Sequence, residues 1–128
     1  MADKHVLVAE DNDLNFRLVQ FVVAKLGIEV RRATTGDQAL VDALADPPAL
    51  IYMDIQLPGM DGLELTRRLK SDPATKDIVI IALTAYAMKG DEEKARAAGC
   101  DGYVAKPIDT DGLPKVIAAR LAVQAGTS

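Results

Sequence analysis

The chain is poor in the residues from which several common kinds of site are built. It has one cysteine and one histidine among 128 residues, which excludes an internal disulfide and makes a histidine-based triad or zinc centre implausible. It has no basic run interleaved with aromatics and a net charge of −4, so direct nucleic-acid binding is not expected. No apolar run is long enough to cross a bilayer, and the N-terminus carries no signal-peptide pattern. These absences favour a cytoplasmic location without membrane insertion.

The apolar residues fall into short runs separated by segments of helical periodicity. With 49% hydrophobic and 27% charged residues, the composition suits one globular domain over residues 1–128, ending in a short polar tail at about 124–128. Strand-length runs that alternate with helical segments are typical of strand–helix units around a parallel sheet. The predicted strands are 5–9, 28–33, 50–53, 78–83 and 103–105, and the predicted helices are about 14–26, 36–45, 62–71, 87–98 and 113–121.

The first and fourth predicted helices differ in how firmly their sequences specify them. In the first, Asp13 is the expected N-cap and Gly27 the expected stop. Its apolar residues recur at helical spacing at Leu14, Leu18, Phe21, Val22 and Leu26. In the fourth, no large apolar residue follows Met88, and Gly90 is expected in the helix interior, at a cost of about 1 kcal/mol. The fourth helix is therefore predicted to be marginal and easily shifted.

The strand patterns predict how the sheet is ordered. The strand at 28–33 alternates apolar and charged residues, as an edge strand does, whereas 50–53 and 78–83 are continuously apolar, as central strands are. Right-handed crossovers then favour a doubly wound (βα)5 flavodoxin-like fold, with strand order 2-1-3-4-5 and helices on both faces. In such sheets ligands bind beyond the carboxyl ends of the strands, where the winding direction switches.

Four polar residues follow predicted strands and would meet at that edge. They are Asp11, Asp54, Thr84 and Lys106, and Glu10 adds a third carboxylate beside Asp11. One acidic residue after a strand is more simply a helix N-cap, but that explanation does not cover the complementary groups on the other strands. Close carboxylates repel one another unless a cation neutralises them, and Mg²⁺ prefers oxygen ligands and phosphate. The pattern predicts a site for a divalent cation and a phosphoryl group.

The same residues suggest a reaction. A carboxylate can attack phosphorus to form an aspartyl phosphate, and Asp54, at the end of a central strand, is the best-placed candidate. Lys106 and Thr84 would then stabilise the transferring group, although a surface lysine and a strand-end threonine are common without any such role. An EF-hand is excluded because Phe16 stands where that loop requires glycine. No glycine-rich phosphate loop comes after the first strand, which argues against a dinucleotide site.

Four stretches of the sequence, together and in this order, carry a family resemblance. They are Val8–Asn12, Met53–Gly62, Leu83–Ala85 and Tyr103–Pro107. In these stretches the chain resembles the receiver domain of bacterial two-component response regulators over essentially its whole length. Within that family it looks most like the stand-alone, single-domain regulators, and receivers attached to hybrid histidine kinases look similar.

The resemblance implies a role for each motif residue. Asp54 would accept a phosphoryl group from a phosphohistidine, and Mg²⁺, or Mn²⁺ in its place, would be held by Asp11, Asp54 and the Gln56 backbone carbonyl, with Glu10 acting through water. Thr84, Lys106 and Ala85 would border the phosphoryl oxygens. Thr84 and Tyr103 would form the switch, and the Lys106–Pro107 peptide bond would be cis.

The resemblance also implies partners and leaves alternatives open. The expected partners are a sensor histidine kinase or histidine phosphotransfer protein upstream and a regulatory protein or kinase downstream, in cell-cycle or developmental control. The surface of the fourth helix, fifth strand and fifth helix would carry the output. Such a protein is not a turnover enzyme, although it assists its own phosphorylation and dephosphorylation. One alternative is a receiver cut out of a hybrid kinase. The other is a Mg²⁺-dependent phosphohydrolase, which Gln56 disfavours because such enzymes need an aspartate there.

Overall fold

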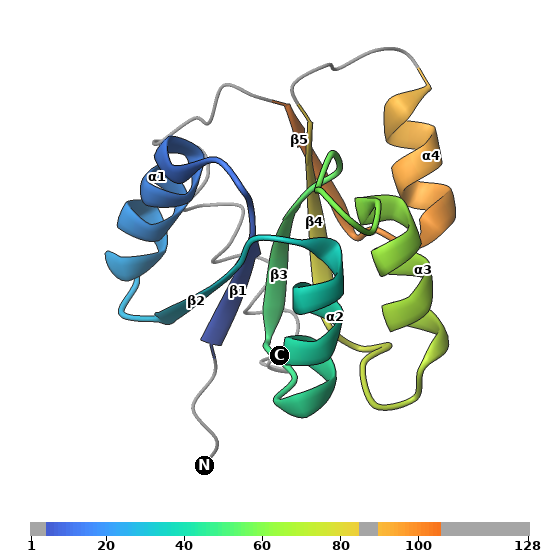
Figure 1. Cartoon of the computed structure of the whole chain (residues 1–128), viewed down its shortest axis with the longest axis horizontal. Coiled ribbons are helices and arrows are strands. Elements are labelled where there is room, and N and C mark those ends of the chain that lie inside the picture. Colours follow the sequence, from blue (N-terminus) through green and yellow to red (C-terminus); the bar gives the residue numbers. More distant parts are fainter. Residues whose placement is uncertain (1–4, 85–89, 106–128) are drawn as a thin grey trace, which may run out of the picture.

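The computed structural model describes residues 5–84 and 90–105, and within them five parallel strands form one sheet (Figure 1). The strand order is β2-β1-β3-β4-β5. This confirms the predicted doubly wound, flavodoxin-like fold. The strands are β1 (His5–Ala9), β2 (Glu29–Ala33), β3 (Leu50–Asp54), β4 (Val79–Thr84) and β5 (Gly102–Ala105).

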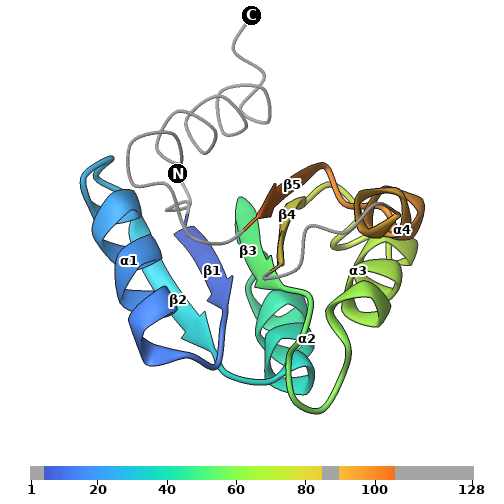
Figure 2. The same cartoon turned by 90° about the horizontal axis from the view of Figure 1, so that it is seen from above.

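The described helices cover both faces of this sheet. Helix α1 lies on one face, and α2, α3 and α4 lie on the other (Figure 2). Their bounds are α1 (Asp13–Ala24), α2 (Gly36–Ala45), α3 (Gly62–Ser71) and α4 (Asp91–Ala98). The predicted fifth helix, at 113–121, falls outside the described residues.

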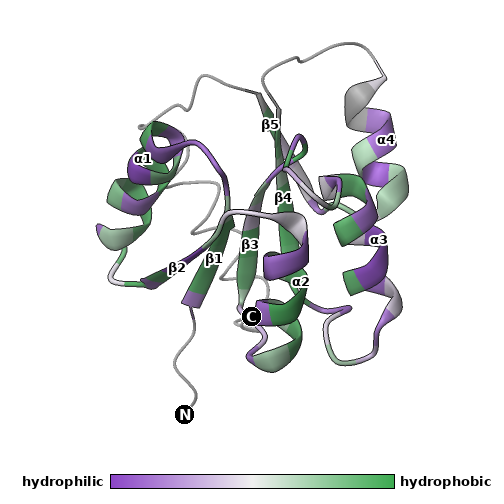
Figure 3. Ribbon diagram, viewed as in Figure 1, coloured by the Kyte–Doolittle hydropathy of each residue, from purple (hydrophilic) through white to green (hydrophobic). Residues whose placement is uncertain are grey.

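The core follows from the alternation of side chains along the central strands. Every residue of β3 is buried, and Ile51 and Met53 pack into one cluster while Leu50 and Tyr52 pack into another, on the opposite face. The edge strand β2 alternates exposed and partly buried residues, as predicted. Figure 3 shows the same contrast, with hydrophobic central strands and hydrophilic residues on the helices. The sheet therefore holds the ends of β1 and β3 at a fixed position in a rigid core.

The structure corrects two expectations about α1. Its N-cap is Asn12, whose side chain accepts a hydrogen bond from the Asn15 amide at 2.9 Å, and Asp13 is the first helical residue. The predicted apolar stripe is also partly wrong, because Leu14 and Phe21 are 66% and 57% exposed. The fully buried face consists of Val19, Val22 and Val23. This helix has apolar residues on more than one side, so periodicity alone could not choose the face that packs on the sheet.

The start of α4 also differs from expectation. Gly90 is its N-cap, with φ +101°, and is not an interior residue, so the expected cost of an interior glycine does not apply. No side chain caps this end of the helix. Among the side chains described in α4, only those of Ala95 and Ala98 are buried. A helix anchored by two alanines buries little apolar surface, as the sequence predicted.

The far end of α4, by contrast, is tied to its neighbours by a lysine. Lys70, near the end of α3, donates from Nζ to the carbonyls of Lys76 at 3.2 Å and Ile78 at 2.7 Å, and to Asp101 Oδ2 at 2.9 Å. The same Asp101 oxygen accepts the Ile80 amide at 2.9 Å. One ammonium group thus joins the end of α3, the entry to β4 and the turn between α4 and β5.

Replacement of Lys70 by methionine is expected to lower the free energy of unfolding by about 2 kcal/mol, because two carbonyls and the Asp101 carboxylate lose a charged donor. Urea denaturation measures this change. The control is Arg67→Met on the same helix, where the exposed pair with Glu64 at 3.4 Å should contribute less than about 0.5 kcal/mol. Equal losses in the two variants would contradict a special role for Lys70.

Candidate functional site

The strand order brings two acidic segments together at the carboxyl edge of the sheet. Strands β1 and β3 are neighbours, with Ala9 paired to Met53, so Glu10 and Asp54 each stand one residue beyond that pair. The Glu10 amide donates to the carbonyl of Ala33 at 3.0 Å, which continues the strand pairing by one residue. After this point the chain runs from β1 to α1 on one face of the sheet, and from β3 to α3 on the opposite face. The acidic residues therefore flank the switch point where such folds bind ligands.

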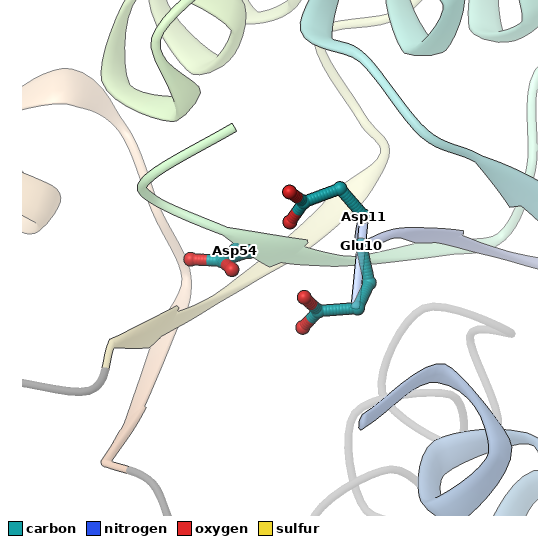
Figure 4. A group of neighbouring side chains, drawn as sticks. All are labelled: Glu10, Asp11 and Asp54. Atoms are coloured by element: carbon teal, nitrogen blue, oxygen red, sulfur yellow. The ribbon is translucent and has the colours of Figure 1, made fainter. Parts of the chain in front are cut away.

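The carboxylates of Glu10, Asp11 and Asp54 converge at this point. Each contributes one oxygen to a group whose members all lie within 4.8 Å of one another. Figure 4 shows Glu10 and Asp11 projecting from the end of β1 toward the side where Asp54 lies. Glu10 is 1% exposed and Asp54 6% exposed, whereas Asp11 faces solvent. Three carboxylates so close, two of them buried, fit a hard divalent cation with oxygen ligands and an open, solvated side.

Backbone amides orient two of these carboxylates. Gln56 donates its amide to Asp54 Oδ1 at 2.9 Å, and Asn12 donates to Glu10 Oε2 at 3.2 Å. Each bond spans two residues, so each acidic side chain is fixed by the loop that comes after its own strand. The two bonds fix the positions of the carboxylate oxygens, and a carboxylate held in place is prepared to bind a cation or attack phosphorus.

The loop between β3 and α3, which carries Gln56, is itself held at several points. The Ile55 amide bonds the carbonyl of Leu83 at 3.0 Å, and the Gly62 amide bonds the carbonyl of Ile55 at 3.0 Å. Pro58 in the middle of the loop accepts the amide of Gly36, the first residue of α2, at 3.2 Å. The loop is therefore tied to β4 and α3 through Ile55, next to Asp54, and to α2 at its far part.

The remaining predicted site residues belong to β4, to β5 and to the segments that follow these two strands in the sequence. The register pairs Asp54 with Leu83 and Thr84 with Ala105, so the backbone of Thr84 is one residue beyond the position opposite Asp54. Tyr103 pairs with Ala82, is half-buried with a buried hydroxyl oxygen, and packs against the core cluster on the α3 side. The expectations for Ala85, Lys106 and Pro107, including the cis peptide, fall outside the described residues.

Sequence reasoning missed a tyrosine beside the acidic cluster. Tyr52 lies two residues before Asp54 within a strand-length apolar run, and its side chain is fully buried on the α1 face of the sheet. Burial, together with the charges of Glu10 and Asp54, raises the pKa of Tyr52 well above its usual range. Within the described part of the chain its hydroxyl has no hydrogen-bond partner. The phenol therefore stays neutral and adds no charge beneath the carboxylates.

The fold and the acidic cluster are those of a doubly wound α/β protein with a site suited to a divalent cation at the switch point of its parallel sheet. Residues 6–118 match the family model described as response regulator receiver domain. The chain belongs to this family. Receiver domains are signalling phosphoacceptors that bind Mg²⁺ at an acidic pocket, and they are generally not turnover enzymes.

Individual relatives agree with this assignment. The chain is 44% identical over 118 residues to the polar-differentiation response regulator DivK of Brucella ovis, an alignment that covers 92% of this chain and 96% of DivK. The receiver domain of the sensor histidine kinase PA1611 from Pseudomonas aeruginosa, solved with a magnesium ion in its active-site cleft, is 32% identical with a TM-score of 0.86, and the match covers 94% and 99% of the two chains.

A third relative comes from a complex. A chain in the co-crystal structure of the Saccharomyces cerevisiae histidine phosphotransfer protein Ypd1 with the receiver domain of Ssk1 is 28% identical, with a TM-score of 0.87, and the match covers 96% of this chain and 92% of that chain. Receiver domains thus interact with histidine phosphotransfer proteins. In the residues that the structure describes, no helix is both long enough and apolar enough to cross a membrane.

Proposed function

We propose that this protein is a single-domain, DivK-like response regulator of a phosphorelay in the cytoplasm, in which Asp54 accepts a phosphoryl group from a phosphohistidine. The observation that carries the proposal is the convergence of Glu10, Asp11 and Asp54 at the switch point of the sheet. The 44% identity to DivK, which extends over nearly all of that protein, supports the single-domain assignment. The donor is a sensor histidine kinase or a histidine phosphotransfer protein, and the acceptor chemistry is the same for both.

In the proposed reaction a carboxylate oxygen of Asp54 attacks phosphorus. The new O–P bond forms as the N–P bond of the phosphohistidine breaks, and the leaving imidazole keeps the electron pair and takes up a proton. The Gln56 amide, bonded to Asp54 Oδ1, orients the carboxylate for this attack. Mg²⁺, when bound, supplies positive charge for the phosphoryl oxygens.

Other residues hold the cation and the phosphoryl group. Asp11, Asp54 and the backbone carbonyl of Gln56 are the cation ligands in this proposal, and Glu10 acts through water. Thr84 and Lys106 contact the phosphoryl oxygens, and the small Ala85 leaves them accessible. The register, which places Thr84 one residue beyond the position opposite Asp54 and pairs it with Ala105 on its other side, supports this arrangement.

The added phosphate then switches a surface of the protein. Phosphorylation brings roughly −1.5 to −2 units of charge, enough to bias an element with two arrangements. Thr84 and Tyr103 respond to it, and the output surface comprises α4, β5 and the fifth helix. The absence of a side-chain cap at the start of α4 and its small buried face support motion there. The downstream partner is a kinase or other regulator in cell-cycle or developmental control.

Two alternatives predict different behaviour. A receiver that belongs to a hybrid kinase, like the PA1611 domain, would have the same site but an output within its own protein. A phosphohydrolase would need a second acid two residues after Asp54, where Gln56 offers an uncharged amide. Because Gln56 disfavours a hydrolase, we propose that the protein is not a turnover enzyme, although it assists its own phosphorylation and dephosphorylation.

Incubation with Mg²⁺ and a small acyl-phosphate donor is expected to add one phosphoryl group per chain, detected by intact mass. Chelation of the metal should prevent the gain in mass, because the repulsion among three carboxylates would no longer be offset. Sustained hydrolysis of a phosphate monoester, which is not an acyl-phosphate donor, would favour the hydrolase. Absence of any gain in mass would contradict the proposal.

The control for metal dependence is Asp11→Asn, which removes a carboxylate that is exposed and distinct from the acceptor. Loss of a residue that only holds a metal ligand in place typically lowers metal affinity at least about tenfold. Because Asp11 is itself a proposed ligand, the Mg²⁺ affinity of this variant should fall by at least that factor. Its phosphorylation should recover at high Mg²⁺ concentration. An unchanged Mg²⁺ requirement in this variant would remove Asp11 from the cation site.

A further inference from the structure

An arginine on the edge strand reaches into the loop that carries the acidic residues. Arg32, the fourth residue of β2, donates from Nε to the carbonyl oxygen of Glu10 at 3.1 Å. Its Nη2 lies 2.8 Å from Asp13 Oδ1, at the first turn of α1. Its guanidinium carbon lies 4.7 Å from the centre of the Phe16 ring. One side chain thus contacts the loop between β1 and α1 on both sides of Asp11.

The position of Asp11 depends on this loop. Within the described residues the Asp11 carboxylate accepts no hydrogen bond, so its placement follows from the backbone that carries it. Glu10, before it, is held by its amide bond to Ala33 and by the Arg32 contact to its carbonyl. Asp13, after it, is held by the Arg32 ion pair. Arg32 therefore connects the two ends of the loop from β2, in addition to the bond between the Asn12 amide and the Glu10 side chain.

We propose that Arg32 is a positioning residue for the cation site, an inference that rests on the proposed function. By fixing Glu10 and Asp13, it holds the backbone of Asp11 where its carboxylate can meet that of Asp54. An exposed ion pair alone would contribute little. Arg32, however, is only 25% exposed, and it combines an ion pair, a charge-assisted bond to a carbonyl and a stacked aromatic ring in one planar group.

The charge of Arg32 makes a competing effect testable. A cation next to the site would by itself repel Mg²⁺, so its removal would tighten binding if only charge mattered. Asp13 offsets that charge at 2.8 Å, which leaves positioning as the larger effect. Arg32→Gln removes both the charge and the guanidinium donors. Loss of the charge alone would tighten Mg²⁺ binding, whereas loss of positioning would weaken it.

The neighbouring residue Arg31 provides a matched control. It lies on the same strand, next in sequence, and its guanidinium is also engaged twice, with Glu29 and Asp46, both at 2.7 Å. None of these partners belongs to the loop between β1 and α1. Arg31→Gln therefore removes the same kind of interaction without touching the acidic site.

The test is a calorimetric Mg²⁺ titration of the native protein, Arg32→Gln, Arg32→Lys and Arg31→Gln, with urea denaturation of each in the absence of metal. The Kd for Mg²⁺ is expected to rise about tenfold in both Arg32 variants and to stay within about twofold in Arg31→Gln. Phosphorylation of the Arg32 variants by the acyl-phosphate donor should recover at saturating Mg²⁺, because Asp54 itself is intact.

Each other outcome has a distinct meaning. Failure of the native protein to bind Mg²⁺ would overturn the proposed function itself. Native binding with tighter or unchanged binding in Arg32→Gln would overturn the role of Arg32 alone. Loss of stability in the Arg32 variants without a change in Mg²⁺ affinity would make Arg32 a purely structural link between β2 and α1, and would also reject the proposal.

Discussion

A protein carrying Asp54→Asn is expected to gain no phosphoryl group under conditions that fully modify the native chain. The asparagine amide has the same shape and can still accept the Gln56 amide through its oxygen, but it is not a nucleophile toward phosphorus. The change also removes one of three carboxylates within 4.8 Å of one another. Without metal, the free energy of unfolding should therefore rise by about 1 kcal/mol, because like-charge repulsion is relieved. Intact mass and urea denaturation measure the two effects.

The control for this variant is Asp61→Asn in the loop after Asp54. Asp61 is the N-cap of α3, its Oδ1 accepts the Leu63 amide at 2.6 Å, and asparagine caps helices about as well as aspartate does. Asp61→Asn loses the same charge from the loop that follows Asp54 and should be phosphorylated normally. Phosphoryl uptake that persists in Asp54→Asn would place the acceptor on another residue.

Much of this fold could be predicted because burial leaves a direct pattern in the strands. A strand covered on both faces must be apolar throughout, as β3 is, and an edge strand with a wet face alternates, as β2 does. Parallel strands end at a common edge, so acidic residues after β1 and at the end of β3 had to meet there. The convergence of Asp11 and Asp54 was predictable for this reason.

Other features depend on tertiary contacts that no local pattern encodes. Leu14 and Phe21 have the spacing of a buried stripe, yet the sheet packs against the valine face of α1. Arg32 stands in the phase of Ile28 and Val30, where the alternation predicts an apolar residue, and nothing in its neighbours reveals that it reaches Glu10, 22 positions away. Tyr52 has the pattern of one more apolar residue in a central strand. Partners so distant along the chain are set by the packed fold, whereas periodicity reports only which residues share a face.

Replacement of Gly62 by alanine is expected to damage both the fold and the site. A Cβ atom at this position would lie 2.9 Å from the Asp54 carbonyl oxygen and 2.9 Å from Ile55 Cα, distances that a packed backbone does not allow. The start of α3 and the segment after Asp54 must therefore move apart, which also strains the Gly62 amide bond to Ile55. The free energy of unfolding should fall by about 2 to 3 kcal/mol. Phosphorylation of the folded protein should slow at least about tenfold, because small displacements of a reacting group are costly.

Gly36→Ala separates the effect on the site from the effect on the fold. Gly36 is also the first residue of a helix, and its Cβ would clash most closely with the Met60 carbonyl oxygen and would lie 2.7 Å from the Met60 Cβ, so a loss of stability at least as large is expected. Its clash falls on the far part of the loop and leaves the Asp54 backbone untouched. Phosphorylation per folded molecule should therefore change by no more than about twofold, on the principle that distant sites act independently. If both alanine variants slow phosphorylation equally, the whole loop must act as one rigid unit around Asp54, and the direct contact of Gly62 with the Asp54 backbone would have no special role.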